Sequence, residues 1–293
     1  MKAMILAAGL GTRLKPLTDN RPKALVDLAG RTLLEITLSR LRSFGVTEVI
    51  VNVHHFADMV LNYLKSNKNF GMRIEISHED VLLDTGGGLK RAAWFFLEDS
   101  APGKSGDSHQ MDDPFLLHNV DVISTIDLRR MLQFHKENHA LATLAVQARE
   151  TSRPLLFDDH LQLRGRRIGH DHATGLVRRD LVGTLQEGTA EPAPTLSGAV
   201  PKNFKNPGAL APEAKSSQPL QALAFSGIHV ISPRLLPMLT EEGIFSIIPS
   251  YLRLAAQGEK ILAFRADQYY WRDLGRPADL AQAALDSQQN AFL

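Results

Sequence analysis

The first half of the chain alternates short apolar segments with amphipathic ones, and this alternation constrains the fold more than any other feature. Strand-like segments lie at Ala3–Leu6, Glu48–Val53, Arg73–Ser77 and Pro114–His118. Between the first two, leucines recur at helical spacing in a segment closed by Gly45. Because strands that alternate with helices form parallel βαβ units, we predict an α/β fold with helices on both faces of the sheet.

The second half is expected to complete the same sheet. Leu141–Val146, Ala222–Ile231 and Lys260–Arg265 have the pattern of strands, and Ser246–Ala256 has that of a helix. The sequence therefore predicts a Rossmann-like mixed sheet in a single domain that spans residues 1–293.

One long segment has a different composition. Residues 184–221 are rich in Pro, Gly, Ala, Ser and Lys and hold few large apolar side chains. Such a segment cannot bury enough apolar surface to order itself. We predict a mobile insertion at 184–221 and a shorter loop of the same kind at 100–113.

Charge and composition exclude several classes of protein. The 33 basic and 32 acidic residues nearly balance, which argues against nucleic acid as a partner. The chain has no cysteine, which fits a reducing compartment and leaves oxygen or histidine as metal ligands. No segment approaches the roughly 18 to 20 apolar residues of a membrane helix, and the first apolar run lacks the length of a signal peptide. We expect a cytoplasmic protein without a membrane partner; the oligomeric state is left unknown.

The segment from Leu6 to Thr18 carries the most informative motif. An apolar strand runs into two glycines, a threonine and two cations, which can bring backbone N–H groups and positive charge to an anion. The candidate substrate-binding residues are Ala8, Gly9, Gly11 and Thr12, and the catalytic candidate is Arg13. We predict a triphosphate loop; the alternative is an ordinary strand-to-helix turn. Leu14 stands where a dinucleotide-binding fingerprint needs its third glycine, which argues against an NAD enzyme.

A second cation follows at Lys23, where Pro22 stiffens the backbone. A lysine held near the loop could clamp phosphates while their charge shifts in the transition state, which makes Lys23 the second catalytic candidate. The alternative is a solvated surface lysine.

Together, Gly9-Leu-Gly-Thr-Arg-Leu-Lys-Pro-Leu-Thr18 and Pro22-Lys23 resemble the signature of the sugar-1-phosphate nucleotidylyltransferase family. The resemblance implies a fold of the nucleotide-diphospho-sugar transferase type, with a nucleoside triphosphate and a sugar 1-phosphate as substrates. It also implies that the glycine loop and Arg13 bind the triphosphate, while Lys23 contacts the reacting phosphates.

Two further glycine segments look like family elements that contact the base and the sugar. Asp84-Thr-Gly-Gly-Gly88 lies between a strand ending near His78 and a helix expected to begin near Leu89. It resembles a base-reading loop, although a flexible glycine turn is an equal alternative. Its candidate residues are Thr85, Gly86 and Gly87, with Glu79 as a weaker one. In Ala224–His229, Gly227 resembles the family glycine that leaves room for the sugar ring.

Two aspartates are the candidate metal ligands. The strand Pro114–His118 leads to Asn119, a substrate-binding candidate, and to Asp121, since ligands collect at the carboxyl ends of such strands. Asp121 could instead be a helix cap, but Asp127 suits that role better. Late in the chain, Trp271-Arg-Asp273-Leu-Gly-Arg-Pro resembles the family segment with the second ligand. The pair predicts Mg²⁺ as cofactor, bound partly by substrate phosphates.

The resemblance carries one departure and leaves the substrates open. Val120 stands where the family most often has glycine. The compact chain and its Thr-Gly-Gly-Gly loop most resemble family members that join UTP to N-acetylmuramate 1-phosphate in cell-wall recycling. Mannose-1-phosphate guanylyltransferases are the nearest alternative. A non-catalytic protein that binds a nucleotide sugar and regulates a partner is the alternative from another class.

Overall fold

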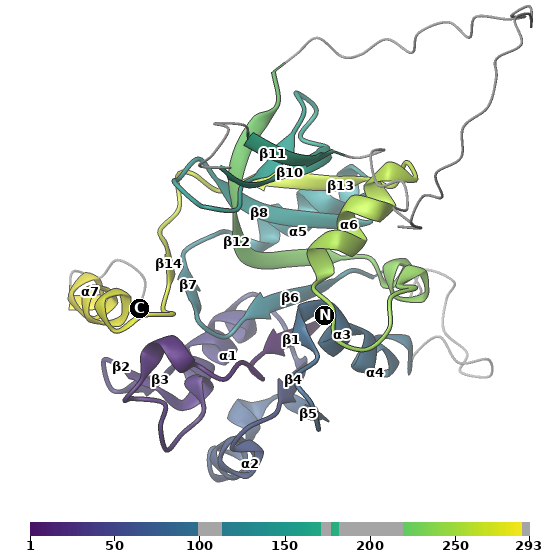
Figure 1. The fold of residues 1–293 in the computed structure, drawn as a ribbon. Helices are drawn as coiled ribbons and strands as arrows, with labels where there is room; N and C mark the ends of the chain where they lie inside the picture. The colour runs from purple at the N-terminus through teal and green to yellow at the C-terminus, as the bar shows by residue number, and fades with distance from the viewer. Residues whose placement is uncertain (99–112, 171–176, 182–218, 289–293) are drawn as a thin grey trace, which may run out of the picture.

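A ten-stranded mixed sheet organises the protein (Figure 1). The computed structural model describes residues 1–98, 113–170, 177–181 and 219–288, and gives only the backbone of 168–170 and 177–181. On one side of the sheet four parallel strands lie in the order β6-β1-β4-β5, with β5 at the edge. They are β1 (Lys2–Leu6), β4 (Glu48–Val53), β5 (Arg73–His78) and β6 (Phe115–Asn119). Each overlaps a strand that the sequence predicts.

The other strands extend the sheet beyond β6 and make it mixed. The long strand β12 runs antiparallel to β6, β8 and β9, and a register shift between Phe225 and His229 interrupts its pairing with β8. β13 is parallel to β8, and β9, β10 and β11 form an antiparallel extension. The bounds are β8 (Ala142–Gln147), β9 (Leu155–Phe157), β10 (Leu163–His170), β11 (Val177–Leu181), β12 (Gln221–Ile231) and β13 (Ile261–Arg265).

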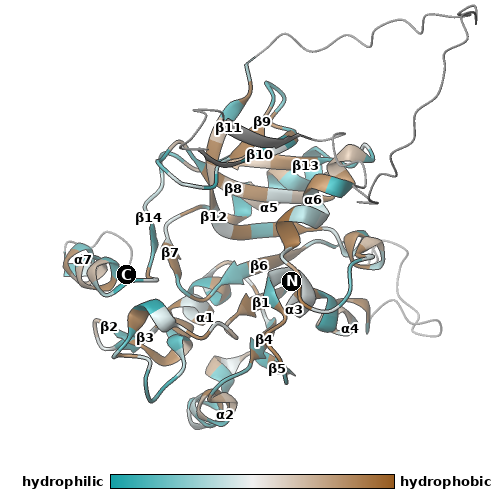
Figure 2. Cartoon of the chain, in the orientation of Figure 1, coloured by the Kyte–Doolittle hydropathy of each residue, from teal (hydrophilic) through white to brown (hydrophobic). Residues whose placement is uncertain are grey.

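Helices cover both faces of the sheet, as the alternation predicts. One face carries α1 (Leu33–Ser43), α2 (Ala57–Ser66) and α5 (Leu128–Glu137), and the other α3 (Asp84–Arg91), α4 (Ala93–Leu97) and α6 (Ile247–Ala256). Helix α7 (Pro277–Gln288) lies beside the first set, and its Ala283 joins the same buried cluster. The strands divide between the two cores by side-chain alternation: Ala3 and Ile5 pack in one, Met4 in the other. Several helices carry both hydrophilic and hydrophobic residues, as amphipathic cover for a sheet requires (Figure 2).

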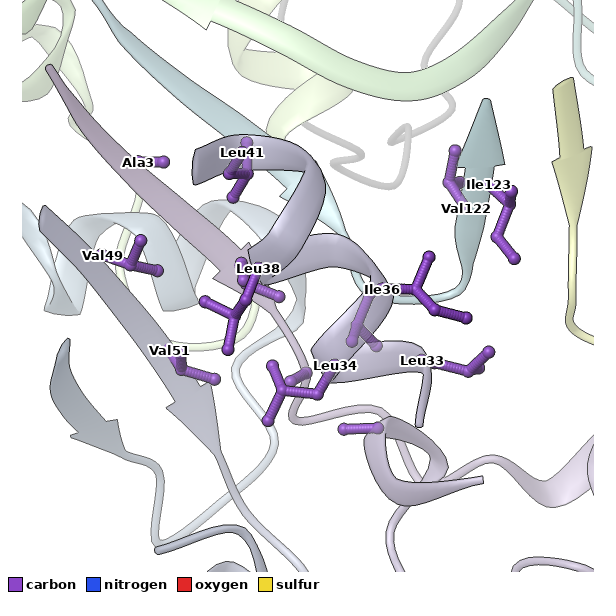
Figure 3. Close-up of a cluster of buried hydrophobic side chains, with 14 of the residues drawn as sticks. Ala3, Leu33, Leu34, Ile36, Leu38, Leu41, Val49, Val51, Val122 and Ile123 are labelled. Carbon is purple, nitrogen blue, oxygen red and sulfur yellow. The ribbon is translucent and has the colours of Figure 1, made fainter. Parts of the chain in front are cut away.

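Helix α1 shows how local sequence fixes an element. The Thr32 side chain accepts a hydrogen bond from Glu35 N at 3.1 Å and caps the helix. Leu38 and Leu41 lie in the same buried cluster as Ala3 and the valines of β4 (Figure 3). The segment closes at Gly45, whose φ of 84° suits glycine, so the predicted helix is confirmed.

Short elements bring distant parts of the chain together. A ribbon of β7 (Val122–Ser124) and β14 (Trp271–Asp273) joins the end of the β6 segment to the C-terminal region. Helix α7 follows β14 and contacts the ribbon of β2 (Asp27–Leu28) and β3 (Arg31–Thr32), so that the late chain lies beside the early chain (Figure 1). The remaining turns are 3-10 helices at Thr12–Leu14, Lys23–Leu25, Lys68–Gly71 and Pro233–Met238.

Two predictions concern segments that the structure largely leaves out. The insertion at 184–221 lies outside the described residues except for 219–221, the last of which opens β12. The loop at 100–113 lies outside them except for Asp113. Within the described part of the chain, the helices are too short or too polar to cross a bilayer.

Candidate active site

A cleft of about 430 Å³ opens where β1, β4 and β6 end. β1 pairs in parallel with β4 on one side and with β6 on the other, so the strand order reverses at β1. A ligand crevice usually lies at the carboxyl ends of the strands where such a reversal occurs. Predicted residues that line this cleft are Ala8, Gly9, Gly11, Thr12, Arg13, Lys23, Glu79, Thr85, Asn119 and Asp121. Four predicted residues do not line it: Gly86, Gly87, Gly227 and Asp273.

The glycine loop after β1 folds tightly around Gly11. With φ of 66°, Gly11 accepts hydrogen bonds on its carbonyl oxygen from Leu14 N at 2.8 Å and Thr18 Oγ1 at 2.9 Å. A Cβ there would come within 2.9 Å of Thr18 Cγ2 and 3.2 Å of Lys23 Cβ. Only glycine fits both the backbone and the space, and this packing holds Lys23 against the loop.

Asn52 supports the loop, and the sequence analysis missed it. Its Oδ1 accepts from Ala7 N at 2.6 Å and Ala8 N at 3.3 Å, and its Nδ2 donates to Glu79 Oε1 at 2.7 Å. An amide inside an otherwise apolar strand, Glu48–Val53, was the available signal, because a buried polar group needs partners.

Glu79 lines the cleft but its carboxylate is committed to the protein. It is 1% exposed, and its Oε2 accepts from Leu83 N at 2.9 Å while Oε1 receives Asn52. A Cβ on Gly88 would lie 2.8 Å from that Oε1, so this glycine gives the carboxylate room. In this structure Glu79 thus positions Asn52, and base binding by Glu79 stays a prediction.

Lys23 points at Asp121. The ammonium donates to Asp121 Oδ2 in an ion pair whose side chains are 10% and 17% exposed. Lys23 is therefore not the solvated surface lysine of the alternative reading. A largely desolvated pair of this kind holds both charges at one position beside the glycine loop.

Asp273 reaches the same place from the other end of the chain. Across the β7–β14 ribbon it pairs with Val122, and Leu274 N donates to Asp121 O at 2.8 Å. Burial raises the pKa of the Asp273 carboxyl and the charge of Asp121 raises it further, whereas Lys23 counteracts the shift. The two carboxylates are thus close enough to repel each other.

Gly275 lets the late segment approach the glycine loop. A Cβ there would lie 2.5 Å from Arg13 Nη2 and 2.8 Å from Asp273 Oδ1. Gly275 N also donates to Asp273 Oδ1 at 2.7 Å, which orients that carboxylate. Arg13, Lys23 and Asp121 therefore line one end of the cleft, with Asp273 behind them, and we call this the phosphate end.

The prediction that residues 84–88 form a loop is wrong, because these residues are helical. Helix α3 begins at Asp84 rather than near Leu89. The N–H groups of Gly86 and Gly87 donate to Phe245 O at 2.9 and 3.1 Å, so they are not free for a base. A Cβ on Gly86 would collide with the Phe245 ring, and one on Gly87 would lie 2.5 Å from Gly243 O. These two glycines serve helix–loop packing.

Thr85, the third candidate residue of this segment, lines the cleft, and its Oγ1 accepts a hydrogen bond from Ile247 N at 3.0 Å. Ile244, from the loop that packs on α3, lines the same end and is 67% exposed. We call this the base end of the cleft.

Gly227 also has a packing reason. Its φ is 74°, and a Cβ would lie 2.9 Å from both Asn119 Nδ2 and Val122 Cγ2. The glycine therefore lets the irregular part of β12 lie against Asn119, and room for a sugar ring stays a prediction. Val120, in place of the usual glycine, is 3% exposed and belongs to the core, so little of it is available to a ligand.

Two carboxylates are suitable donors for a hard cation. In the described part of the chain no three His, Cys, Asp or Glu side chains cluster as a metal site. Asp121 and Asp273 repel each other and already attract the Lys23 ammonium, so the donor set fits a divalent cation that takes its other ligands from phosphate and water.

Three buried histidines lie outside this chemistry. Burial lowers the pKa of His118 and His135 to about 4 and that of His229 to about 3, so all three are neutral at pH 7. His229 Nδ1 lies 2.8 Å from the Tyr251 hydroxyl, and His135 contacts the hydroxyls of Thr143 and Ser232. Asp127 caps α5 by accepting from Arg129 N and Arg130 N, as expected.

Comparisons with known proteins identify the family. The family model described as nucleotidyl transferase matches residues 2–157. The N-acetylmuramate alpha-1-phosphate uridylyltransferase of Caulobacter vibrioides is 33% identical over 96% of this chain and 95% of its own. A mannose-1-phosphate guanylyltransferase of Arabidopsis thaliana is 36% identical over 50% of this chain and 38% of its own length. The chain therefore belongs to the nucleotidyl transferase family and is a sugar-1-phosphate nucleotidyltransferase.

Solved structures show the same fold at low identity. HddC from Yersinia pseudotuberculosis, complexed with GMP-PN, has a TM-score of 0.62 and 18% identity, with 98% of this chain and 99% of that chain covered. UDP-glucose pyrophosphorylase from Acinetobacter baumanii has a TM-score of 0.66 and 16% identity, with 99% and 93% covered. The predicted nucleotide-diphospho-sugar transferase fold is confirmed.

Proposed function

We propose that this enzyme joins UTP and N-acetylmuramate 1-phosphate into UDP-N-acetylmuramate and pyrophosphate, with Mg²⁺ held by Asp121 and Asp273. The observation that carries the choice of substrates is the similarity, over nearly the whole of both chains, to the N-acetylmuramate alpha-1-phosphate uridylyltransferase of Caulobacter vibrioides. That similarity spans both the N-terminal loop and the C-terminal region that supplies Asp273.

Mannose 1-phosphate with GTP is the second candidate. The mannose-1-phosphate guanylyltransferases are 36 to 37% identical, but over only 147 residues, which is half of this chain and 38% of their own length. Because the shared part is only half of this chain, it bears less on the sugar than a similarity over the whole chain does.

In the proposed reaction, a phosphate oxygen of the sugar attacks the α-phosphorus of UTP in line. The bond to the β-phosphate breaks, and pyrophosphate leaves with the electron pair. The attacking phosphate is already an anion at neutral pH, so no side chain has to remove a proton. Catalysis then consists of positioning and of neutralising charge.

The residues of the phosphate end are suited to those two tasks. Backbone groups of the loop around Gly11, held by Asn52, would bind the triphosphate. Arg13 and the desolvated Lys23 would balance the charge that develops on the phosphates. Mg²⁺ on Asp121 and Asp273 would supply further charge neutralisation and a fixed geometry.

A pyrophosphate-release screen tests the proposal. The purified protein is assayed with UTP, GTP, TTP, CTP and ATP, each against N-acetylmuramate, N-acetylglucosamine, glucose and mannose 1-phosphates. We expect the highest kcat/KM for UTP with N-acetylmuramate 1-phosphate. A preference for GTP with mannose 1-phosphate would select the second candidate, and no turnover with any pair would favour a non-catalytic nucleotide-sugar-binding protein.

A further inference from the structure

Arg149, which follows β8, is a guanidinium without an acidic partner among the described side chains. Its Nη2 donates to Phe225 O at 2.8 Å, and this is its one hydrogen bond to the described part of the protein. Its Nε is buried with no hydrogen-bond partner there. A guanidinium carries five N–H donors, so most of this capacity is left for something else.

The guanidinium of Arg149 stacks on the ring of Trp271. The Arg149 Cζ lies 3.8 Å from the centroid of the Trp271 ring, and Trp271 Nε1 donates to Ser226 O at 2.7 Å. Both carbonyls that anchor this stack belong to the stretch of β12 where its pairing with β8 is interrupted, between Phe225 and His229. Stacking uses the flat face of a guanidinium and leaves its edge donors available.

The stack lies beside the phosphate end of the cleft. Trp271 and Asp273 are two residues apart on β14, so their side chains share one face of the ribbon. Burial lowers the pKa of Arg149 while the charge of Asp273 raises it, so the two groups are near one another without forming an ion pair. The stretch of β12 that anchors the stack also reaches the cleft, because its Gly227 packs against Asn119, which lines the cleft.

We propose that Arg149 binds an anionic oxygen group of the sugar 1-phosphate substrate, either its phosphate or a carboxylate on its sugar. A planar fork of N–H donors matches a carboxylate or a phosphate, and a guanidinium with no acidic partner among the described side chains attracts either. The inference rests on the proposed function, whose sugar carries both groups, the 1-phosphate and a lactyl carboxylate.

The experiment compares Arg149→Met with the wild-type enzyme on two sugars, N-acetylmuramate 1-phosphate and N-acetylglucosamine 1-phosphate, which lacks the carboxylate. We expect the KM for the sugar to rise about 10- to 100-fold, the scale of a lost hydrogen bond to a charged group, while the KM for UTP is unchanged. Arg149→Lys keeps the charge without the fork and should lie between. Calorimetric titration of the sugar 1-phosphate measures binding directly.

Arg129→Met is the matched control. Arg129 also lies over an aromatic ring, that of Phe44 at 5.5 Å, and donates to a backbone carbonyl, Ser43 O at 3.1 Å, but far from the cleft. Its replacement should leave both KM values as in the wild type. Melting curves check that each variant folds; if Arg149→Met is unfolded, Arg149→Lys carries the test.

The outcomes separate the sources of the anion. A raised KM for both sugars assigns Arg149 to the phosphate, and a raised KM for the carboxylate sugar alone assigns it to the carboxylate. An unchanged sugar KM in the folded variant, or an equal rise for UTP, would overturn the proposal. If wild-type enzyme rejects both sugars, the proposed function has failed, and Arg149 is tested on the pair that the enzyme accepts.

Discussion

The two ends of the cleft are built on different principles. At the phosphate end, charged side chains come together from three distant segments: Arg13 and Lys23 after β1, Asp121 after β6, and Asp273 in β14. At the base end, the glycines of α3 are packed into protein and their N–H groups bond to Phe245 O. Charged residues predicted near strand ends, such as Arg13, Lys23 and Asp121, do line the cleft. A run of glycines can either bind a ligand or allow close packing, and only the structure shows that Gly86 and Gly87 do the latter.

The largest effect is expected from the carboxylates of the phosphate end. Asp273→Asn and Asp121→Asn should each reduce kcat about 10³-fold and abolish its dependence on Mg²⁺, since losing a metal ligand removes several kcal/mol of charge stabilisation. Pyrophosphate release over a Mg²⁺ titration measures this. Asp159→Asn, on the turn between β9 and β10, serves as control, and an unchanged metal response would refute the ligand assignment.

Asp273→Asn should also make the protein more stable, in contrast with its loss of activity. The folded-state pKa of Asp273 is raised, so its contribution to stability is present at low pH and is lost as the pH rises through that pKa. Replacing the buried charge by an amide should therefore raise the melting temperature at neutral pH. The gain should disappear in acid, which a melt at two pH values can show.

The next effect is expected at Lys23. Lys23→Ala should lower turnover about 10²- to 10³-fold with the fold intact, because it removes a desolvated cation near the reacting phosphates. Lys65→Ala is the control, since Lys65 is an exposed lysine on α2 that does not line the cleft. Near-normal turnover of Lys23→Ala would remove this residue from the mechanism.

A pair of alanine substitutions compares the two ends directly. Gly86→Ala should reduce the free energy of unfolding by about 1 to 3 kcal/mol, the usual cost of overpacking, because the new Cβ meets the Phe245 ring. Gly9→Ala meets no atom within 4 Å, so its stability should be near that of the wild type while binding of the triphosphate weakens. Denaturant unfolding and the KM for UTP separate the two effects; a stable Gly86→Ala would contradict the packing role.

The smallest effect concerns pH and three buried histidines, His118 on β6, His135 on α5 and His229 on β12. Their folded-state pKa values are depressed, so the stability they contribute is present above the unfolded value near 6.5 and is lost as the pH falls towards about 4. His229→Gln should reduce the loss between pH 7 and 5.5 by about 1 kcal/mol. His160→Gln, whose parent side chain is 86% exposed, should leave it unchanged. An equal slope in both variants would show that His229 is not neutral when folded.

Much of the fold could be predicted because its signals are local. The four parallel strands and helices α1 and α6 follow from apolar periodicity, and for α1 also from the closing Gly45. The short ribbons could not be found in this way, since β7 and β14 have three residues each and exist through their pairing. The start of α3 was misplaced because glycines disfavour helix, and contacts with Phe245 outweigh that preference.

What the sequence alone determined is the chemistry at strand ends: a glycine loop with Arg13 and Lys23 after β1, and carboxylates after β6 and in β14. Only the tertiary structure decided which polar groups remain free for a ligand. Glu79 and the N–H groups of Gly86 and Gly87 form hydrogen bonds within the protein. Tertiary packing also places Asn52 under the glycine loop and Arg149 against β12. The reason is that a hydrogen bond between residues distant along the chain depends on how the elements pack, and local sequence does not encode that arrangement.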